Sequence, residues 1–228
     1  MWCILIIAKC NNKIHDCFFS YILISLKIAY WLHKEKNKKN IAKKNGRIIY
    51  MLSKKELRKK ILKIVDSQTE KQISTNSNII SQKLLALPIV KKSKSFFIYV
   101  SFGKEVKTHE IINKLINNGK TVTVPKILKP GIMTAVEISS QKQLVLGKFN
   151  ILEPLSSKPY EKKIDVGIIP CVAVSPTNIR LGRGGGYYDR FLKQHGEMYN
   201  IALAYDFQMV ERIPSETHDQ KIDLIISN

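Results

Sequence analysis

The sequence predicts an α/β fold in which an open, mostly parallel sheet carries helices on both faces, a three-layer Rossmann-like arrangement within a single domain. Two observations support this prediction. Short apolar runs bounded by turn residues alternate with segments that carry apolar side chains at helical spacing, a pattern typical of parallel sheets. In addition, residues 51–228 have the length of one folding unit that can bury a proper core.

Four segments carry the signals of helices. Ser53 can cap the first helix, because Glu56 completes a capping box and apolar residues follow from Leu57 at helical spacing. A proline is expected to end the second helix, since it restricts the residue before it, and a glycine is expected to close the third. The three later helices are expected at residues 76–87, 107–118 and 188–194.

Strands are expected where short runs of β-branched and aromatic residues stand between turn residues. Ligands of parallel sheets bind beyond the carboxyl ends of the strands. Two polar segments follow strands, residues 101–105 and the glycine-rich residues 180–188, so we expect both to face one crevice. The expected strands are residues 95–100, 121–125, 165–174, 200–205 and 222–226, with shorter antiparallel pieces at 133–138 and 143–146.

The most informative segment runs from Arg180 to Leu192 and reads RLGRGGGYYDRFL. Glycine permits positive φ and a close approach of a ligand to the backbone. A strand, a glycine loop and a helix start together point backbone N–H groups at an anion, and Arg180 and Arg183 would add charge-assisted bonds to phosphate oxygens. The pattern therefore predicts a phosphate site.

Asp189 narrows the kind of ligand. A carboxylate beside a phosphate site would repel the ligand unless a divalent cation lay between them, and Mg²⁺ is commonly held by one or two carboxylates plus phosphates. The segment therefore indicates a nucleotide with its metal ion. It is neither a Walker loop nor a G-x-G-x-x-G motif, because the last glycine place falls on Tyr187 or Asp189. The alternative is a surface loop in which Asp189 only favours the helix start.

The run RLGRGGGYYDRFL, preceded by a strand that ends in Pro170-x-x-Ala173, resembles the 5-formyltetrahydrofolate cyclo-ligase family, also called 5,10-methenyltetrahydrofolate synthetases. Other segments are similar to the family in the same order, so the resemblance covers residues 51–228 as one domain and leaves residues 1–50 outside. These segments are residues 54–58, 101–112, 119–126 and 147–154, Gln208, Pro214, residues 218–219 and 222–226.

The resemblance implies an ATP- and Mg²⁺-dependent reaction that converts 5-formyltetrahydrofolate to 5,10-methenyltetrahydrofolate, with release of ADP and phosphate. The formamide oxygen is a poor leaving group, so the γ-phosphate would first be transferred to it. The N10 amine of the folate would then close the ring, and phosphate would depart. Such chemistry asks for positioning and electrostatics more than for a covalent nucleophile.

Carried over position by position, the resemblance assigns roles to residues of this sequence. Arg183 and Tyr187 would be catalytic, and Asp189 and Asp219 would hold the metal ion. The ATP-binding residues would be Lys54, Arg58, Arg180, Leu181, Gly182, Arg183, Gly184, Gly185, Gly186, Tyr187 and Tyr188. The folate-binding residues would be Val100, Glu105, Arg183, Gly184, Gly185, Gly186 and Tyr187. Glu105 would accept hydrogen bonds from the N–H groups of the pterin.

Without the resemblance, several of these residues have a simpler interpretation. Lys54, Arg58, Glu105 and Asp219 would be ordinary charged residues on a helix or in loops, and at least one of the two tyrosines would fill core space. The sequence also departs from the family pattern. In this sequence Val174, Ser175 and Asn178 stand where the family has Phe-Asp and a glycine. Because asparagine tolerates positive φ, we expect the turn to survive.

Residues 1–50 contain an apolar stretch, residues 17–32, that is interrupted by Lys27. A spanning helix needs roughly 20 predominantly apolar residues, and no small-residue cleavage site of a signal peptide follows. Met51 stands directly before the first matching motif. We therefore expect a start codon assigned too far upstream, with a short amphipathic or membrane-associating extension as the alternative. For residues 51–228 we expect no membrane partner.

The formal charge is +20, of which +12 lies in residues 51–228. A basic nucleic-acid-binding module would explain this charge, but the lysines are spread along the chain instead of gathering with aromatic residues. We therefore expect a monomeric enzyme that acts on a small molecule. An ATP-dependent relative with another substrate is the second alternative, because function depends on the site and not on the fold. Cys171 is the only cysteine of residues 51–228, which agrees with a reducing cytoplasm.

Overall fold

The computed structural model describes residues 41–44, 47–50, 52–147, 150–217 and 219–228. They belong to two units, Met1–Ser53 and Lys54–Asn228, which are treated separately. Of the first unit, the structure describes an antiparallel hairpin of β1 (Ile41–Lys44) and β2 (Arg47–Tyr50). The expectation for residues 17–32 lies outside the described residues. Among those that are described, no helix is long and apolar enough to cross a membrane.

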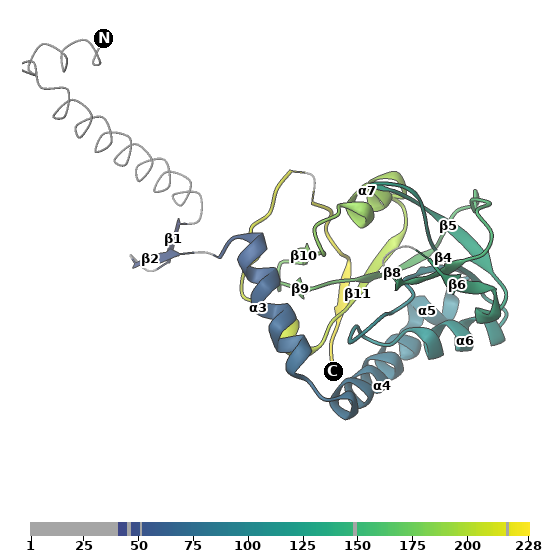
Figure 1. Cartoon of the computed structure of the whole chain (residues 1–228), viewed down its shortest axis with the longest axis horizontal. Coiled ribbons are helices and arrows are strands. Elements are labelled where there is room, and N and C mark those ends of the chain that lie inside the picture. Colours follow the sequence, from purple (N-terminus) through teal and green to yellow (C-terminus); the bar gives the residue numbers. More distant parts are fainter. Residues whose placement is uncertain (1–40, 45–46, 51, 148–149, 218) are drawn as a thin grey trace, which may run out of the picture. The chain divides into compact units, whose positions relative to one another are not determined.

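The second unit is built on a six-stranded sheet with the order β12-β11-β8-β3-β4-β5 (Figure 1). Neighbouring strands are parallel except for β4 and β5, which pair antiparallel at one edge. The predicted α/β class with a mostly parallel sheet is therefore confirmed. The strands are β3 (Ser95–Ile98), β4 (Thr121–Lys129), β5 (Ile132–Ile138), β8 (Val166–Pro170), β11 (Tyr199–Leu203) and β12 (Leu224–Ile226).

Helices cover both faces of this sheet. Successive side chains of a strand point to opposite faces, so neighbouring residues of β3 contact helices on opposite faces. Phe96 and Ile98 of β3 belong to one apolar cluster with residues of α4 (Glu70–Ala86), α5 (Pro88–Lys92) and α6 (His109–Asn117). Phe97, between them, points to the other face and stacks on Phe191 of α7 (Tyr187–Gln194), with ring centroids 4.2 Å apart. The strand is buried on both faces, which explains why the apolar residues Phe96, Phe97 and Ile98 follow one another without alternation.

A third apolar cluster lies against α3 (Lys54–Ser67), the first helix of this unit. Leu57, Ile61 and Val65 recur at helical spacing and pack with residues of β9 (Ala173–Val174) and β10 (Arg180–Leu181). These two strands form a short antiparallel hairpin. The packing brings α3 beside the segment that follows β10. A separate two-stranded sheet of β6 (Leu144–Leu146) and β7 (Leu152–Pro154) confirms the expected antiparallel piece.

Three element boundaries differ from the prediction for identifiable reasons. The second helix begins at Glu70 and not at residue 76, because Thr69 and Gln72 form a capping box that the sequence analysis overlooked. The strand expected at residues 165–174 is divided, since β8 ends at Pro170, which lacks a backbone donor. β4 continues through Pro125 to Lys129. This proline is tolerated because β3 pairs with β4 only as far as Thr123.

The turn between β9 and β10 carries the departure from the family pattern. Asn178 has a φ of +61°, so asparagine does adopt the left-handed conformation expected of it. The hydroxyls of Ser175 and Thr177 are 2.9 Å apart and hydrogen-bonded, and the Asn178 N–H donates to the Ser175 carbonyl. The turn is therefore formed without the residues that the family has there.

Candidate active site

The glycine loop, residues 182–186, joins β10 to the start of α7. Gly184 and Gly186 have φ values of +103° and +66°, which side chains with a Cβ rarely permit. Gly186 precedes α7 without a side-chain cap. Within the described part of the chain, the backbone N–H groups of residues 183–188 have no hydrogen-bond acceptor. A row of free donors at a helix N-terminus is suited to an anion, as the sequence predicted.

Helix α3 brings two of the expected phosphate-binding cations to this loop. The Nε of Arg58 donates to the carbonyl oxygen of Gly182 at 2.7 Å. Lys54 lies one turn earlier on the same face of the helix, and its Nζ contacts both carboxylate oxygens of Asp219 at 2.8 and 2.7 Å. Lys54, Arg58, Asp219 and the glycine loop are therefore gathered at one place, although 165 residues separate Lys54 from Asp219.

The buried Arg180 side chain forms an ion pair with the partly buried Asp189. The Nη2 of Arg180 lies 2.8 Å from Oδ1 of Asp189, and the Arg180 side chain is only 2% exposed. Its Nη1 donates to the carbonyl oxygen of Pro170 at 3.2 Å, and its Cζ lies 5.7 Å from the centroid of the Tyr188 ring. Arg180 therefore belongs to β10, where it orients Asp189. It does not lie in the exposed loop, where the sequence analysis expected it.

Glu105 approaches the loop from the other expected segment, the one that follows β3. Its Oε1 accepts from Nε and Nη2 of Arg183 at 3.1 and 2.9 Å, and the Arg183 guanidinium lies 4.6 Å from the centroid of the Phe102 ring. Burial raises the pKa of the Glu105 carboxyl above its ordinary value, while Arg183 and the Phe102 N–H act in the opposite direction. The two segments are therefore in contact, which the predicted shared crevice requires.

Two tyrosines that the sequence analysis did not select hold the Glu105 segment. The Tyr205 hydroxyl is fully buried and donates to the Glu105 carbonyl oxygen at 3.1 Å, while it also bonds the Ser77 hydroxyl at 2.9 Å. The Tyr99 hydroxyl donates to the Val106 carbonyl oxygen at 2.8 Å. Burial raises the pKa of Tyr205 to about 12. Tyr99 and Tyr205 both stand in strand-like apolar segments, where aromatic residues usually fill the core. No sequence signal therefore shows that their hydroxyls hold the Glu105 segment.

The remaining expected residues are mostly part of the core. Val100 and Leu181 are buried in apolar clusters, so only their backbones are available to a ligand. Tyr188 is half-buried and packs against the apolar clusters of both sheet faces, which confirms that at least one tyrosine fills core space. Burial also raises the pKa of the Tyr188 hydroxyl. Tyr187 is partly exposed at the first position of α7.

A common pattern links these residues: each of the three expected ligand-binding carboxylates is paired with an expected phosphate- or folate-binding cation. The pairs are Lys54–Asp219, Arg180–Asp189 and Arg183–Glu105. No group of three or more metal-ligating side chains occurs among the described residues. The assignment of Asp189 and Asp219 to a metal ion therefore stays a prediction, and it concerns a cation such as Mg²⁺ that obtains its other ligands from phosphates and water.

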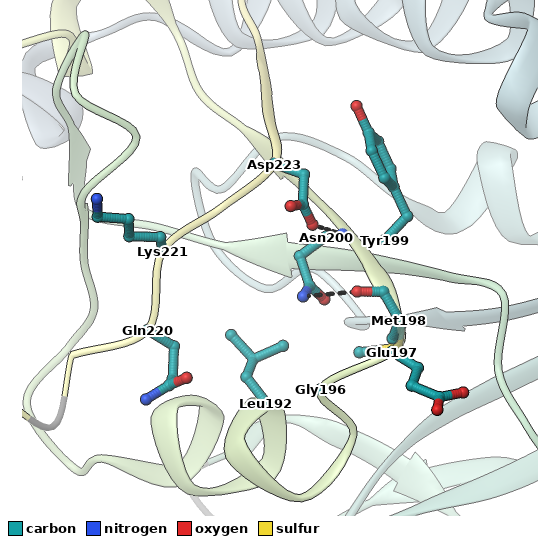
Figure 2. A pocket seen from close by; sticks show the side chains of 9 residues that line it. All are labelled: Leu192, Gly196, Glu197, Met198, Tyr199, Asn200, Gln220, Lys221 and Asp223. Atoms are coloured by element: carbon teal, nitrogen blue, oxygen red, sulfur yellow. Dashed lines mark hydrogen bonds between the residues drawn. The ribbon is translucent and has the colours of Figure 1, made fainter.

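A hollow of the described surface lies elsewhere, at the amino end of β11 (Figure 2). It has a volume of about 350 Å³, and its lining includes Leu192 near the end of α7, Glu197, Asn200 and Asp223. Asp223 accepts from the Asn200 N–H at 2.7 Å, so its carboxylate is used within the fold. Since ligands of parallel sheets bind at the carboxyl ends of the strands, this hollow is on the wrong edge for the expected site.

Comparison with known proteins is consistent with the geometry. A model of the 5-formyltetrahydrofolate cyclo-ligase family matches residues 50–228. A 5-formyltetrahydrofolate cyclo-ligase from Mus musculus is 31% identical over 164 residues, which cover 66% of this chain and 81% of the relative.

Two solved structures are also similar. The 5,10-methenyltetrahydrofolate synthetase of Aquifex aeolicus has a TM-score of 0.67 and 30% identity, and the match covers 76% of this chain and 88% of that one. The 5,10-methenyltetrahydrofolate synthetase of Mycoplasma pneumoniae has a TM-score of 0.61 and 27% identity, with 77% of this chain and 99% of that one covered.

Proposed function

Because this chain belongs to the 5-formyltetrahydrofolate cyclo-ligase family, we propose that it uses ATP and Mg²⁺ to convert 5-formyltetrahydrofolate to 5,10-methenyltetrahydrofolate, ADP and phosphate. One observation carries the proposal beyond family membership. Three carboxylates from separate segments, each paired with a cation, surround a loop whose backbone N–H groups are free. Phosphates would satisfy the cations, a metal ion would satisfy Asp189 and Asp219, and the N–H groups of the pterin would satisfy Glu105.

In the proposed reaction, an oxygen of the formyl group attacks the γ-phosphorus of ATP, and the bond to the β-phosphate oxygen breaks. The carbon so activated is attacked by the N10 amine, which closes the five-membered ring. Phosphate then leaves with the former formyl oxygen, and the N10 proton is released. The protein contributes position and charge to these steps, because no covalent nucleophile is required.

The residues of the site divide this work. Lys54, Arg58 and the N–H groups of the glycine loop bind the phosphates of ATP, with charge-assisted bonds from the two cations. Arg183 contacts Glu105 of the folate segment and would stabilise the charge on the transferring phosphoryl group, and Tyr187 at the start of α7 would be its catalytic partner. Asp189 and Asp219 would hold Mg²⁺, which, when bound, neutralises phosphate charge.

On the folate side, the ionised Glu105 accepts hydrogen bonds from the pterin. The Arg183 contact supports this role, because it lowers the pKa of the Glu105 carboxyl and so opposes the effect of burial, which raises that pKa. We also propose that residues 51–228 act as a monomer and suffice for the reaction. The Mycoplasma pneumoniae structure is matched over almost its whole length by only 77% of this chain, which supports that boundary. A variant without residues 1–50 should then match the activity of the full chain.

The proposal is tested by following the absorbance of the methenyl product when the full chain meets 5-formyltetrahydrofolate with ATP and Mg²⁺ together, and with each omitted. Formation of product only in the complete mixture supports it. A substrate with ¹⁸O in the formyl group tests the mechanism, because the label should appear in the released phosphate. A folded chain that hydrolyses ATP without responding to the folate would instead favour another substrate. Salt-dependent RNA or DNA binding without ATP binding would favour a nucleic-acid module.

A further inference from the structure

Arg190 joins the glycine loop to a distant hairpin. It lies on α7, beside β5 in the fold (Figure 1). Its Nη2 donates to the carbonyl oxygen of Gly185 in the loop at 2.6 Å, and its Nε donates to the carbonyl oxygen of Gly131 at 2.6 Å. Gly131 is in the turn between β4 and β5. One guanidinium therefore bonds two backbone segments that are 54 residues apart in the sequence.

The two glycines nearest to this guanidinium leave room for it. A Cβ on Gly131 would lie 2.9 Å from Nη2 of Arg190, and a Cβ on Gly186 would lie 2.6 Å from Nη1. Both residues also have positive φ, +77° at Gly131 and +66° at Gly186. The Cζ of Arg190 lies 5.8 Å from the centroid of the Tyr187 ring, a favourable cation–π distance. Three neighbouring positions are thus adapted to one arginine side chain.

We propose that Arg190 is a positioning residue that fixes the glycine loop in its nucleotide-binding form by anchoring it to the β4–β5 turn. This inference rests on the proposed function, since it assigns the loop to ATP. A planar guanidinium can donate to two carbonyl oxygens in fixed directions, which the single ammonium group of lysine does not reproduce. The loop N–H groups point at an anion only while the Gly185 peptide is held. Without the anchor, nucleotide binding must also order the loop.

The kinetic test uses Arg190→Met and Arg190→Lys in the full chain. We expect the KM for ATP to rise about tenfold in both variants, as for the loss of a hydrogen bond from a charged group, while the KM for 5-formyltetrahydrofolate changes less than twofold. Lys193→Met, an exposed lysine on the same helix, is the matched control and should leave both constants unchanged. Equal increases in both KM values, or no increase, would overturn the inference.

A second variant tests the far end of the anchor. Gly131→Ala places a methyl group 2.9 Å from Nη2 of Arg190, which must then shift, so it should also raise the KM for ATP, although Gly131 is not in the glycine loop. If both changes act by breaking the same contact, the double variant Gly131→Ala with Arg190→Met should be no worse than Arg190→Met alone. Additive effects would show that the two positions act separately and would contradict the proposal.

Limited trypsin digestion separates this inference from the proposed function. Arg183 is exposed in the loop, and cleavage after it requires the loop to open locally. In the ligand-free full chain we expect this cleavage to be severalfold faster in Arg190→Met than in the wild-type or Lys193→Met proteins. If the wild type lacks cyclo-ligase activity but cleavage is accelerated, only the proposed function fails. If the wild type is active and cleavage is unchanged, only the anchor fails.

Discussion

The glycine-loop site and the hollow at the amino end of β11 lie at the two ends of α7, and both contain charged side chains. In the loop site, carboxylates pair with cations from segments 165 and 78 residues away in the sequence. In the hollow, Asp223 bonds the nearby Asn200 N–H, and Glu197 pairs with Lys163 in an exposed position. The two carboxylates of the hollow are thus used within the fold, whereas the Oδ1 of Asn200 is buried there without a hydrogen-bond partner in the described part of the chain.

The difference between the two regions lies in how their charged groups are partnered, and not in the presence of charge alone. Partly buried ion pairs assembled from distant segments lose hydration and are not needed to stabilise an α/β core. The N–H groups of the loop beside them have no protein acceptor among the described residues and are therefore open to a ligand. Both features are expected where a charged ligand completes the arrangement. The hollow shows neither a free row of donors nor a pair of this kind.

Among the variants that test the difference between the two regions, Asp189→Asn is expected to cause the largest loss of activity. The change removes a carboxylate proposed to hold Mg²⁺ and leaves the buried Arg180 without its counter-charge. We expect kcat to fall on the order of 10²- to 10³-fold, as for loss of one electrostatic group of an active site. Thermal unfolding should occur at a lower temperature as well.

The matched control changes a carboxylate that lines the hollow. Glu197→Gln alters an exposed side chain whose partner is the exposed Lys163, so the temperature of thermal unfolding should stay close to that of the wild type. The cyclo-ligase activity should stay at the wild-type level. A comparable loss of activity in Glu197→Gln would remove the distinction between the two regions.

A smaller effect is expected from Lys54→Met. This change removes a cation that contacts Asp219 and is proposed to bind phosphate. The KM for ATP should rise about tenfold, with a smaller effect on the KM for the folate. Lys63→Met is the control, because it removes the same single positive charge from the exposed face of the same helix. It should leave both KM values unchanged. Steady-state kinetics with ATP as the varied substrate decides between these outcomes.

A change in pH dependence is expected from Arg183→Met. Burial raises the pKa of Glu105 and Arg183 lowers it, so removal of Arg183 leaves burial less opposed. The pKa of the carboxyl then rises further, and the ionised fraction at a given pH falls. The acid limb of 5-formyltetrahydrofolate binding should therefore move to higher pH. The variant should also lose stability as pH rises from the ordinary carboxyl pKa through the raised one, because the folded state retains the proton longer.

The smallest effect is expected at Cys171, which lies between β8 and the hairpin that leads to the loop. Burial raises the pKa of its thiol to about 12, and its Sγ lies 3.2 Å from the Leu203 carbonyl oxygen. At pH 8 the thiol is therefore protonated and a poor nucleophile. Cys171→Ala should retain full activity. Iodoacetamide should modify the Cys171 peptide much more slowly in the folded than in the denatured chain, as measured by mass spectrometry.

The fold and the glycine loop could be predicted because their signals are local. Hydrophobic spacing marks the elements, and glycines that alternate with arginines between a strand and a helix mark the loop. The partners of the charges could not be predicted. Lys54 and Asp219 meet only because α3 packs on the β9–β10 hairpin, which depends on the tertiary fold.

Residues that act through the backbone of others also escaped the sequence analysis. Arg190 has the appearance of a solvated charge on a helix, and its bonds to Gly131 and Gly185 exist only because β4, β5 and α7 are neighbours. Tyr205 has the appearance of a core aromatic residue, and only the fold shows that its hydroxyl holds the Glu105 segment. Single-sequence patterns carry no information on such long-range contacts.

Hydrogen exchange of the full chain, measured with and without ATP and Mg²⁺, tests the central claim most directly. In the ligand-free protein the N–H groups of residues 183–188 have no acceptor within the described part of the chain, so they should exchange quickly. We expect the ligand to protect these residues and the start of α3, while residues 196–200 and 220–223 around the hollow stay unchanged. Protection at the hollow, with the glycine loop unaffected, would contradict the account.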